Sequence, residues 1–219
     1  MRINIKNIFY LAVALTFSMS QAGSYEDFFT AVKRDDAEAV RALLGRGFDP
    51  DTLDPKGLSG LYLALREPSP KVAAALIGWP RTNVEIRTRE DESPLMMAAL
   101  KGHLDLTRQL VERGADVNKT GWTPLHYAAT GGHVAIIELL LEHHAYIDAE
   151  SPNGTTPLMM AAQYGSIGAV KLLLDAGADP GLKNKLGLSA IDFAYRVNRT
   201  EAAELIASAM RRAQPKGKW

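Results

Sequence analysis

Apolar residues along this chain recur at the spacing of short amphipathic helices, and the helices come in pairs. The first stretch of each pair ends in adjacent small residues, as in Leu125-His-Tyr-Ala-Ala129, and the second is a leucine run such as Glu138-Leu-Leu-Leu141. Polar stretches that contain glycine separate one pair from the next. This pattern predicts helix–turn–helix pairs joined by projecting turns.

The same pattern repeats at a nearly constant interval. The stretch Thr123-Pro-Leu-His-Tyr-Ala-Ala129 recurs 33 residues later as Thr156-Pro-Leu-Met-Met-Ala-Ala162, and Ser93-Pro-Leu-Met-Met-Ala-Ala99 precedes it by 30 residues. Weaker copies begin at Ser59 and Ser189. A period of this length is typical of repeat proteins, in which each unit buries its apolar face against its neighbours.

Individual residues of the repeat have identifiable physical roles. Thr123 and Thr156 are placed to cap a helix, because a hydroxyl accepts hydrogen bonds from the free N–H groups of the first turn. The following Pro124 and Pro157 stand at the first helical position, where a missing N–H is tolerated. Glycine after the leucine run, as at Gly114, allows the left-handed turn that ends a helix.

The stretch Gly121-Trp-Thr-Pro-Leu-His-Tyr-Ala-Ala-Thr-Gly-Gly-His133, followed by Glu138-Leu-Leu-Leu141, resembles the ankyrin repeat. The resemblance extends over residues 25–213. It implies an all-α ankyrin repeat solenoid of about six helix-turn-helix units, two of them caps, with hairpin fingers and a surface that binds other proteins. We place these units roughly at residues 25–50, 51–83, 84–117, 118–147, 148–180 and 181–213.

The first 22 residues differ from the rest of the chain. Arg2 and Lys6 precede the apolar run from Ile8 to Phe17, and the small residues Ser20 and Ala22 fit a signal peptidase site before Gly23. We therefore predict a signal peptide at 1–22, a repeat domain at 23–213 and a flexible tail at 214–219. A retained anchor is the alternative, but an apolar run of about ten residues is half of what a bilayer span needs.

Composition excludes several classes of function. With 25 basic and 25 acidic residues, the chain has no large field to attract nucleic acid, so we expect no nucleic-acid partner. It contains no cysteine, which excludes disulfides and thiolate metal sites. After removal of a signal peptide, we expect no membrane partner.

The histidines and acidic residues give little support for catalysis. His126, His133 and His103 occupy positions where the ankyrin family uses imidazole for structural hydrogen bonds. His144 stands where a turn glycine is expected, and with the adjacent His143 it is the only hint of a zinc site. No nucleophile elbow or phosphate-binding loop is present. We expect no catalytic residue, no cofactor and no metal, and therefore no enzyme.

The resemblance implies that partner contacts come from positions that the repeat leaves free, beside the finger glycine and after the alanine pair. These positions are expected to line one concave face. Aromatic residues among them are good candidates for binding hot spots. The predicted contact residues are Leu58, Arg89, Glu92, Leu100, Lys119, Trp122, Thr155, Gln163, Tyr164 and Leu188.

We therefore expect an exported, monomeric module that binds a protein partner on its fingers and inner helices. A bacterial periplasm is the favoured location, with secretion as the alternative. The module would support its partner like a chaperone or would inhibit it. Two other hypotheses remain: a secreted effector that mimics host ankyrin contacts, and a metal-dependent enzyme.

Overall fold

The computed structural model describes residues 23–213, which form two compact units, one ending at Asn83 and the other beginning at Val84. These residues form helices and turns, with one isolated antiparallel bridge between Leu53 and Ser59. Unit 1 contains a helical segment at residues 23–33 and the helices α2 (Ala37–Gly45), α3 (Gly60–Arg66) and α4 (Pro70–Ile77). Unit 2 contains α5 (Pro94–Lys101), α6 (Leu104–Glu112), α7 (Pro124–Gly131), α8 (Val134–Glu142), α9 (Pro157–Gln163), α10 (Ile167–Asp175), α11 (Ala190–Arg196) and α12 (Thr200–Ala213).

The core of unit 1 is built around aromatic side chains from the first helical segment. Phe28 is fully buried, and its ring lies 5.2 Å from that of Phe29 and 4.8 Å from that of Phe48. Gly60 begins α3 directly against this cluster, since a Cβ there would lie 2.6 Å from the Phe28 ring. Helix α4 packs against both α2 and α3.

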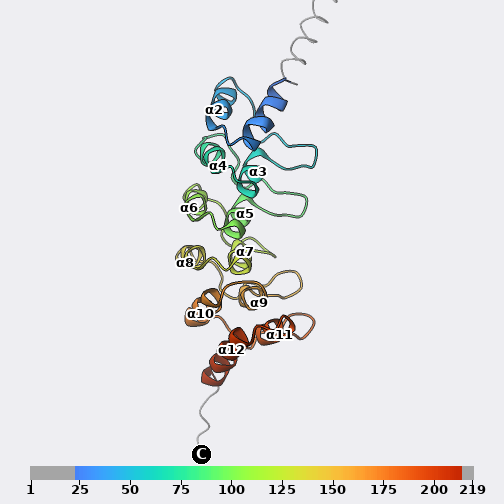
Figure 1. The fold of residues 1–219 in the computed structure, drawn as a ribbon, viewed down its shortest axis with the longest axis vertical. Helices are drawn as coiled ribbons and strands as arrows, with labels where there is room; N and C mark the ends of the chain where they lie inside the picture. Colours follow the sequence, from blue (N-terminus) through green and yellow to red (C-terminus); the bar gives the residue numbers. More distant parts are fainter. Residues whose placement is uncertain (1–22, 214–219) are drawn as a thin grey trace, which may run out of the picture. The chain divides into compact units, whose positions relative to one another are not determined.

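Unit 2 consists of stacked helix pairs, as the repeat predicts. The inner helices α5, α7, α9 and α11, which are the first of each pair, pack each on the next (Figure 1). The outer helices α6, α8, α10 and α12 lie beside them. Small residues permit the close approach: a Cβ on Gly165 would lie 2.2 Å from the carbonyl oxygen of Ala129. Stacking of neighbouring repeats is therefore confirmed within this unit.

The predicted helix caps are also confirmed. Thr123 caps α7 and Thr156 caps α9, each accepting a hydrogen bond from a backbone N–H of the first turn. Ser93 caps α5 in the same way. Each of the three helices begins with proline, whose fixed φ suits the first helical position.

A left-handed residue follows each outer helix from α6 to α10. Gly114 and Gly177 have φ of 84° and 99°, and His144 occupies the same place in its repeat with φ of 63°. The sequence-based expectation for His144 is thus confirmed. Because a side chain with a Cβ is strained in this region, His144 stores a small amount of conformational energy.

Within residues 23–213, no helix is both long enough and apolar enough to cross a bilayer. The predicted signal peptide at 1–22 and the tail at 214–219 lie outside the described residues.

Candidate partner-binding surface

Hairpin turns between the helix pairs form the fingers, which project from the side of the inner helices (Figure 1). In unit 1, Asp54 N–H donates to the carbonyl of Leu58 at 2.8 Å. In unit 2, Asn184 N–H donates to the carbonyl of Leu188 at 2.9 Å. The finger that precedes α7, residues 115–122, is visibly shorter than its neighbours in unit 2. Each turn fixes the residues that follow the finger glycine relative to the helix.

The ten predicted contact residues differ widely in exposure. Tyr164, at the C-terminal end of α9, is 59% exposed, and Arg89 is also exposed. In contrast, Lys119 is only 9% exposed and Thr155 only 1%. The remaining six are half-buried: Leu58, Glu92, Leu100, Trp122, Gln163 and Leu188.

Thr155 and Lys119 are engaged in internal contacts instead of facing outward. Thr155 N–H donates to Ser151 Oγ at 3.0 Å, and the Thr155 carbonyl accepts from His126 Nε2 at 2.8 Å. The Lys119 ammonium pairs with the Asp91 carboxylate of the preceding finger and donates to the Thr120 carbonyl at 3.0 Å. The hydrogen bond that the Lys119 ammonium donates to the Asp91 carboxylate lowers the pKa of Asp91. We therefore leave both residues out of the proposed contact set.

Two half-buried candidates are partly engaged in internal contacts. The Trp122 ring meets the His126 imidazole edge-on, with ring centroids 5.2 Å apart, so this side chain has a packing role within its repeat. Glu92 accepts a 2.7 Å hydrogen bond from the Tyr127 hydroxyl. Among the aromatic and aliphatic candidates, Tyr164 has the largest free surface.

The structural role expected for His126 and His133 is confirmed. His126 is fully buried; its Nε2 donates to Thr155 and its Nδ1 accepts from Thr123 N–H at 3.1 Å. Burial lowers the pKa of His126 to about 4, so the ring is neutral at physiological pH. His133 Nε2 donates to the Leu100 carbonyl of the preceding repeat at 3.0 Å.

His143 and His144 are both exposed at the end of α8. Across residues 23–213, no three His, Asp or Glu side chains are grouped so that they could hold a metal ion. The hypothesis of a metal-dependent enzyme therefore gains no support from the arrangement of side chains.

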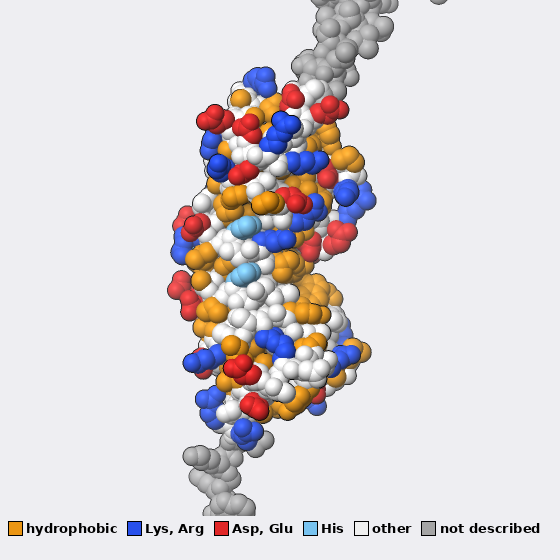
Figure 2. Space-filling model, in the orientation of Figure 1, with side chains coloured by type: hydrophobic (Ala, Val, Ile, Leu, Met, Phe, Trp, Pro, Cys, Tyr) orange, Lys and Arg blue, Asp and Glu red, His pale blue; other side chains and the backbone are white. Residues whose placement is uncertain are grey.

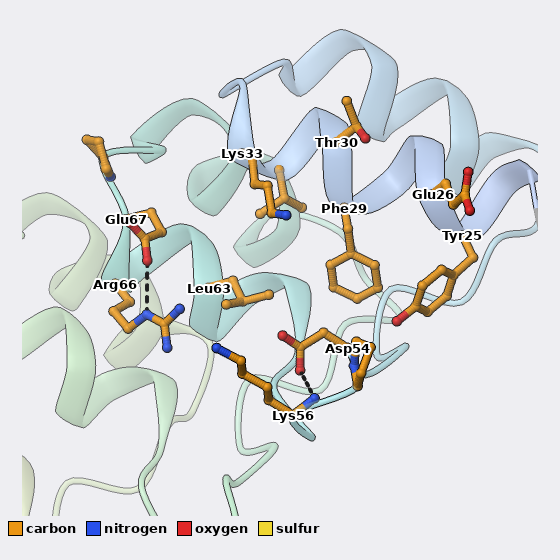
Figure 3. Close-up of a pocket in the computed structure, with 13 residues that line it drawn as sticks. Tyr25, Glu26, Phe29, Thr30, Lys33, Asp54, Lys56, Leu63, Arg66 and Glu67 are labelled. Carbon is orange, nitrogen blue, oxygen red and sulfur yellow. Dashed lines mark hydrogen bonds and ion pairs between the residues drawn. The ribbon is translucent and has the colours of Figure 1, made fainter.

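Two features lie outside the ten predicted contact residues. Leu186, a free position beside the glycine of the last finger, is 76% exposed. In unit 1, a cavity of about 710 Å³ opens between residues 23–33, the first finger (residues 53–59) and the end of α3 (Figure 3). No sequence signal predicts this cavity, because its shape depends on how the first helical segment packs.

Charged side chains do not gather by sign on the face shown in Figure 2. Lys and Arg alternate with Asp and Glu over both units, and hydrophobic side chains lie between them. This distribution agrees with the balanced composition, and the face shown offers no extended basic area of the kind that binds nucleic acid.

Comparison with known proteins identifies one family. A family model of ankyrin repeats in three copies matches residues 28–120, 69–151, 117–184 and 144–215. Mouse B-cell lymphoma 3 protein homolog is 32% identical over 154 residues, 67% of this chain and 34% of that protein. A putative ankyrin repeat protein from Rickettsia bellii is 28% identical over 124 residues, 52% of this chain and 35% of that protein. The chain thus spans about a third of the length of these two relatives.

Two solved structures share the fold over most of the chain. An ankyrin repeat domain from Acinetobacter baumannii has a TM-score of 0.70 and 28% identity, covering 84% of this chain and 97% of that one. A chain in the complex of a predatory endopeptidase from Bdellovibrio bacteriovorus with an immunity protein has a TM-score of 0.71 and 24% identity. That match covers 83% of this chain and 97% of the other.

Proposed function

Since this chain belongs to the ankyrin repeat family, whose repeats serve as protein-binding modules, we propose that it is an exported, non-catalytic module that holds one partner protein on its fingers and inner helices. The observation that carries the proposal is the exposure of Tyr164 at 59% and Leu186 at 76%. Both belong to unit 2, one at the end of an inner helix and one at the tip of a finger. Neither is needed for the stacking of the repeats.

Exposed apolar side chains of this kind suit a binding surface. Single exposed hydrophobic residues are ordinary, but aromatic anchors among free positions are the residues on which interfaces depend most. The surface is also preformed, because hydrogen-bonded turns fix the fingers and packed helices fix the inner positions. Binding on such a surface loses little conformational entropy.

We favour inhibition of the partner over chaperone-like support. The fold matches a chain from a complex between an endopeptidase and an immunity protein, so this architecture occurs in an assembly that contains an enzyme. A partner enzyme in the same exported compartment would fit the predicted signal peptide at residues 1–22. On this proposal, adding the purified module lowers the activity of its partner enzyme in a saturable manner.

Affinity capture from the periplasm of the native organism tests the proposal. The bait is the mature protein, compared with a Tyr164→Ala/Leu186→Ala variant. The wild-type bait should recover a specific partner, and the variant should bind that partner at least ten-fold more weakly, since each truncated hot spot costs about 1–2 kcal/mol.

Tyr146→Ala is the matched control. Tyr146 is 68% exposed, but it lies after the outer helix α8 and not on a finger tip or inner helix end. The control should capture the partner as wild type does. Equal capture by the double variant, or equal losses in all variants, would show that the partner binds elsewhere.

A further inference from the structure

The cavity of unit 1 has an apolar floor. Phe29 and Val32 come from the first helical segment and Leu63 from α3, and all three are buried. Tyr25 closes one end, where its hydroxyl donates to the Leu53 carbonyl at 3.4 Å. With a volume of about 710 Å³, the cavity is within the size range of sites that enclose a bulky side chain or a small ligand.

Three cations surround this floor. Lys56 and Arg66 point toward one another at the end opposite Tyr25, and Lys33 reaches over the cavity from the first helical segment (Figure 3). Within residues 23–213, neither Lys33 nor Lys56 has a carboxylate partner. Converging like charges repel one another, and this repulsion is relieved when a carboxylate lies between them.

None of the three acidic residues that line the cavity forms an ion pair with Lys33 or Lys56. Asp54 accepts hydrogen bonds from the backbone N–H groups of Lys56 at 2.8 Å and Leu58 at 2.9 Å. Glu67 pairs with Nε of Arg66 at 3.1 Å, which leaves the other guanidinium nitrogens available. Glu26 lies at the far end, beside Tyr25 (Figure 3).

We propose that this cavity holds a segment of the partner protein in which one bulky apolar side chain is flanked on both sides by Asp or Glu. The apolar side chain would cover the Phe29–Leu63 floor. Because cations stand at Lys33 on the first helical segment, at Lys56 on the finger and at Arg66 at the end of α3, a carboxylate on each side of the apolar residue can meet one of them. The inference rests on the proposed function, since the ligand is part of a protein.

The free positions that follow α5 show an independent preference of the same sign, whereas the finger before α5 carries the acidic Glu92. The positions after α5 lie beside a finger glycine or after a small-residue pair. Three of them are basic, namely Lys119, Lys185 and Arg196, and none is Asp or Glu. Lys119 is paired with Asp91, whereas Lys185 and Arg196 are exposed. An acidic partner segment would be accepted at these positions without like-charge repulsion.

A peptide titration tests the proposal on the mature protein without knowledge of the partner. The probe is acetyl-Glu-Asp-Phe-Asp-Glu-amide, added to isotope-labelled protein at low salt and followed by amide chemical shifts. We expect saturable shifts at the residues that line the cavity, with a Kd on the order of 0.1–1 mM for so short a ligand.

Two control peptides separate the parts of the proposal. Replacing Phe by Ala, or all four acids by their amides, should weaken binding at least ten-fold. Acetyl-phenylalanine with a free carboxylate should bind much more weakly than the probe. Equal binding of that compound would assign the cavity to a chain end and overturn the flanked-segment proposal, as would shifts located elsewhere or no binding at all.

Matched protein variants complete the test. Lys56→Glu/Arg66→Glu should weaken the probe at least ten-fold, whereas Arg41→Glu/Lys71→Glu changes the same charge at exposed sites outside the cavity and should not. If neither double variant weakens binding of the probe, or if both do, the proposal is contradicted. If partner capture still depends on Tyr164 and Leu186 while the peptide fails to bind here, this inference is wrong and the proposed function stands.

Discussion

His126 shows how one buried residue can join two repeats. Its ring accepts from Thr123 within its own repeat and donates to the carbonyl of Thr155 in the next. Both bonds suit the neutral form with the proton on Nε2. A second proton would have to sit on Nδ1, opposite the N–H of Thr123, in a fully buried site.

We predict that His126 makes the protein sensitive to mild acid. Its pKa is about 4 in the folded state, against about 6.5 when unfolded. Above pH 6.5 the lowered pKa has no effect on the free energy of unfolding. As the pH drops toward 4 this free energy decreases, because the unfolded chain binds a proton that the folded chain does not. The free energy of unfolding should decrease by up to ~3 kcal/mol over this range.

The variant His126→Met isolates this effect. Methionine fills the equivalent position in two other repeats, as Met96 and Met159, and does not titrate. At pH 7.5 the variant should be about 1 kcal/mol less stable, since one hydrogen bond is lost. Urea unfolding at pH 7.5 and pH 5 should show a smaller acid loss in this variant than in wild type or in His143→Ala. Identical losses would contradict the assignment to His126.

We predict that His144→Gly stabilises the protein. The residue has φ of 63°, where glycine is unstrained, and its exposed side chain has little packing to lose. Relief of strain exceeds the added flexibility of the unfolded chain, for a net gain of about 0.5–1 kcal/mol. Thermal unfolding of this variant, compared with His143→Gly one residue earlier, provides the check. His143→Gly should not stabilise, because φ there is −94°.

At the scale of elements, the residue immediately before each of the outer helices α8, α10 and α12 ties one repeat to the previous one. His133 before α8 donates to Leu100, Ser166 before α10 donates to Gly132 at 2.8 Å, and Arg199 before α12 donates to Ala161 at 2.8 Å. Three different side chains thus reach a carbonyl at the end of an inner helix. These side chains differ in length and chemistry, but each forms a hydrogen bond to the preceding repeat.

Ser166 has two roles, and we predict that both are lost in Ser166→Ala. Its Oγ accepts from Ala169 N–H at 3.1 Å, which caps α10, and donates to Gly132. Removal should destabilise unit 2 by about 1–2 kcal/mol. Ser166→Thr keeps both bonds and should stay within ~0.5 kcal/mol of wild type by chemical denaturation. A harmless alanine variant would mean that neither bond contributes.

At the scale of the whole molecule, the structure consists of two units with cores of their own, one built around Phe28 and the other around inner helices that stack through alanines. Each unit carries part of the free positions. The candidate site is therefore spread over many elements, unlike an enzyme site, where a few side chains converge.

Export concerns the whole chain and is tested directly. We predict that expression in a bacterial host gives a periplasmic protein whose intact mass begins at Gly23, because Ser20 and Ala22 fit the small pockets of a signal peptidase. Ala22→Arg should block cleavage, and Ser18→Arg should not. A mature protein that still begins at Met1 would disprove the prediction.

Much of the fold could be predicted because the ankyrin motif is set by residues that are close together in the sequence. Caps such as Thr123, the proline after it and the left-handed turn at His144 depend on residues close in sequence, and the structure confirms them. The free positions of the site follow from the same register. Their exposure could not be predicted, because the burial of Lys119 depends on Asp91 of another finger and that of Thr155 on the packing of its finger against His126 of α7.

The sequence by itself determined the repeat, its helix pairs and the structural use of His126, since each rests on short-range patterning that recurs along the chain. Only the tertiary structure decided which free positions offer surface, and it alone formed the cavity between residues 23–33, the first finger and α3. Packing between segments distant in sequence sets both properties, and such packing depends on the shapes of side chains that no single repeat contains.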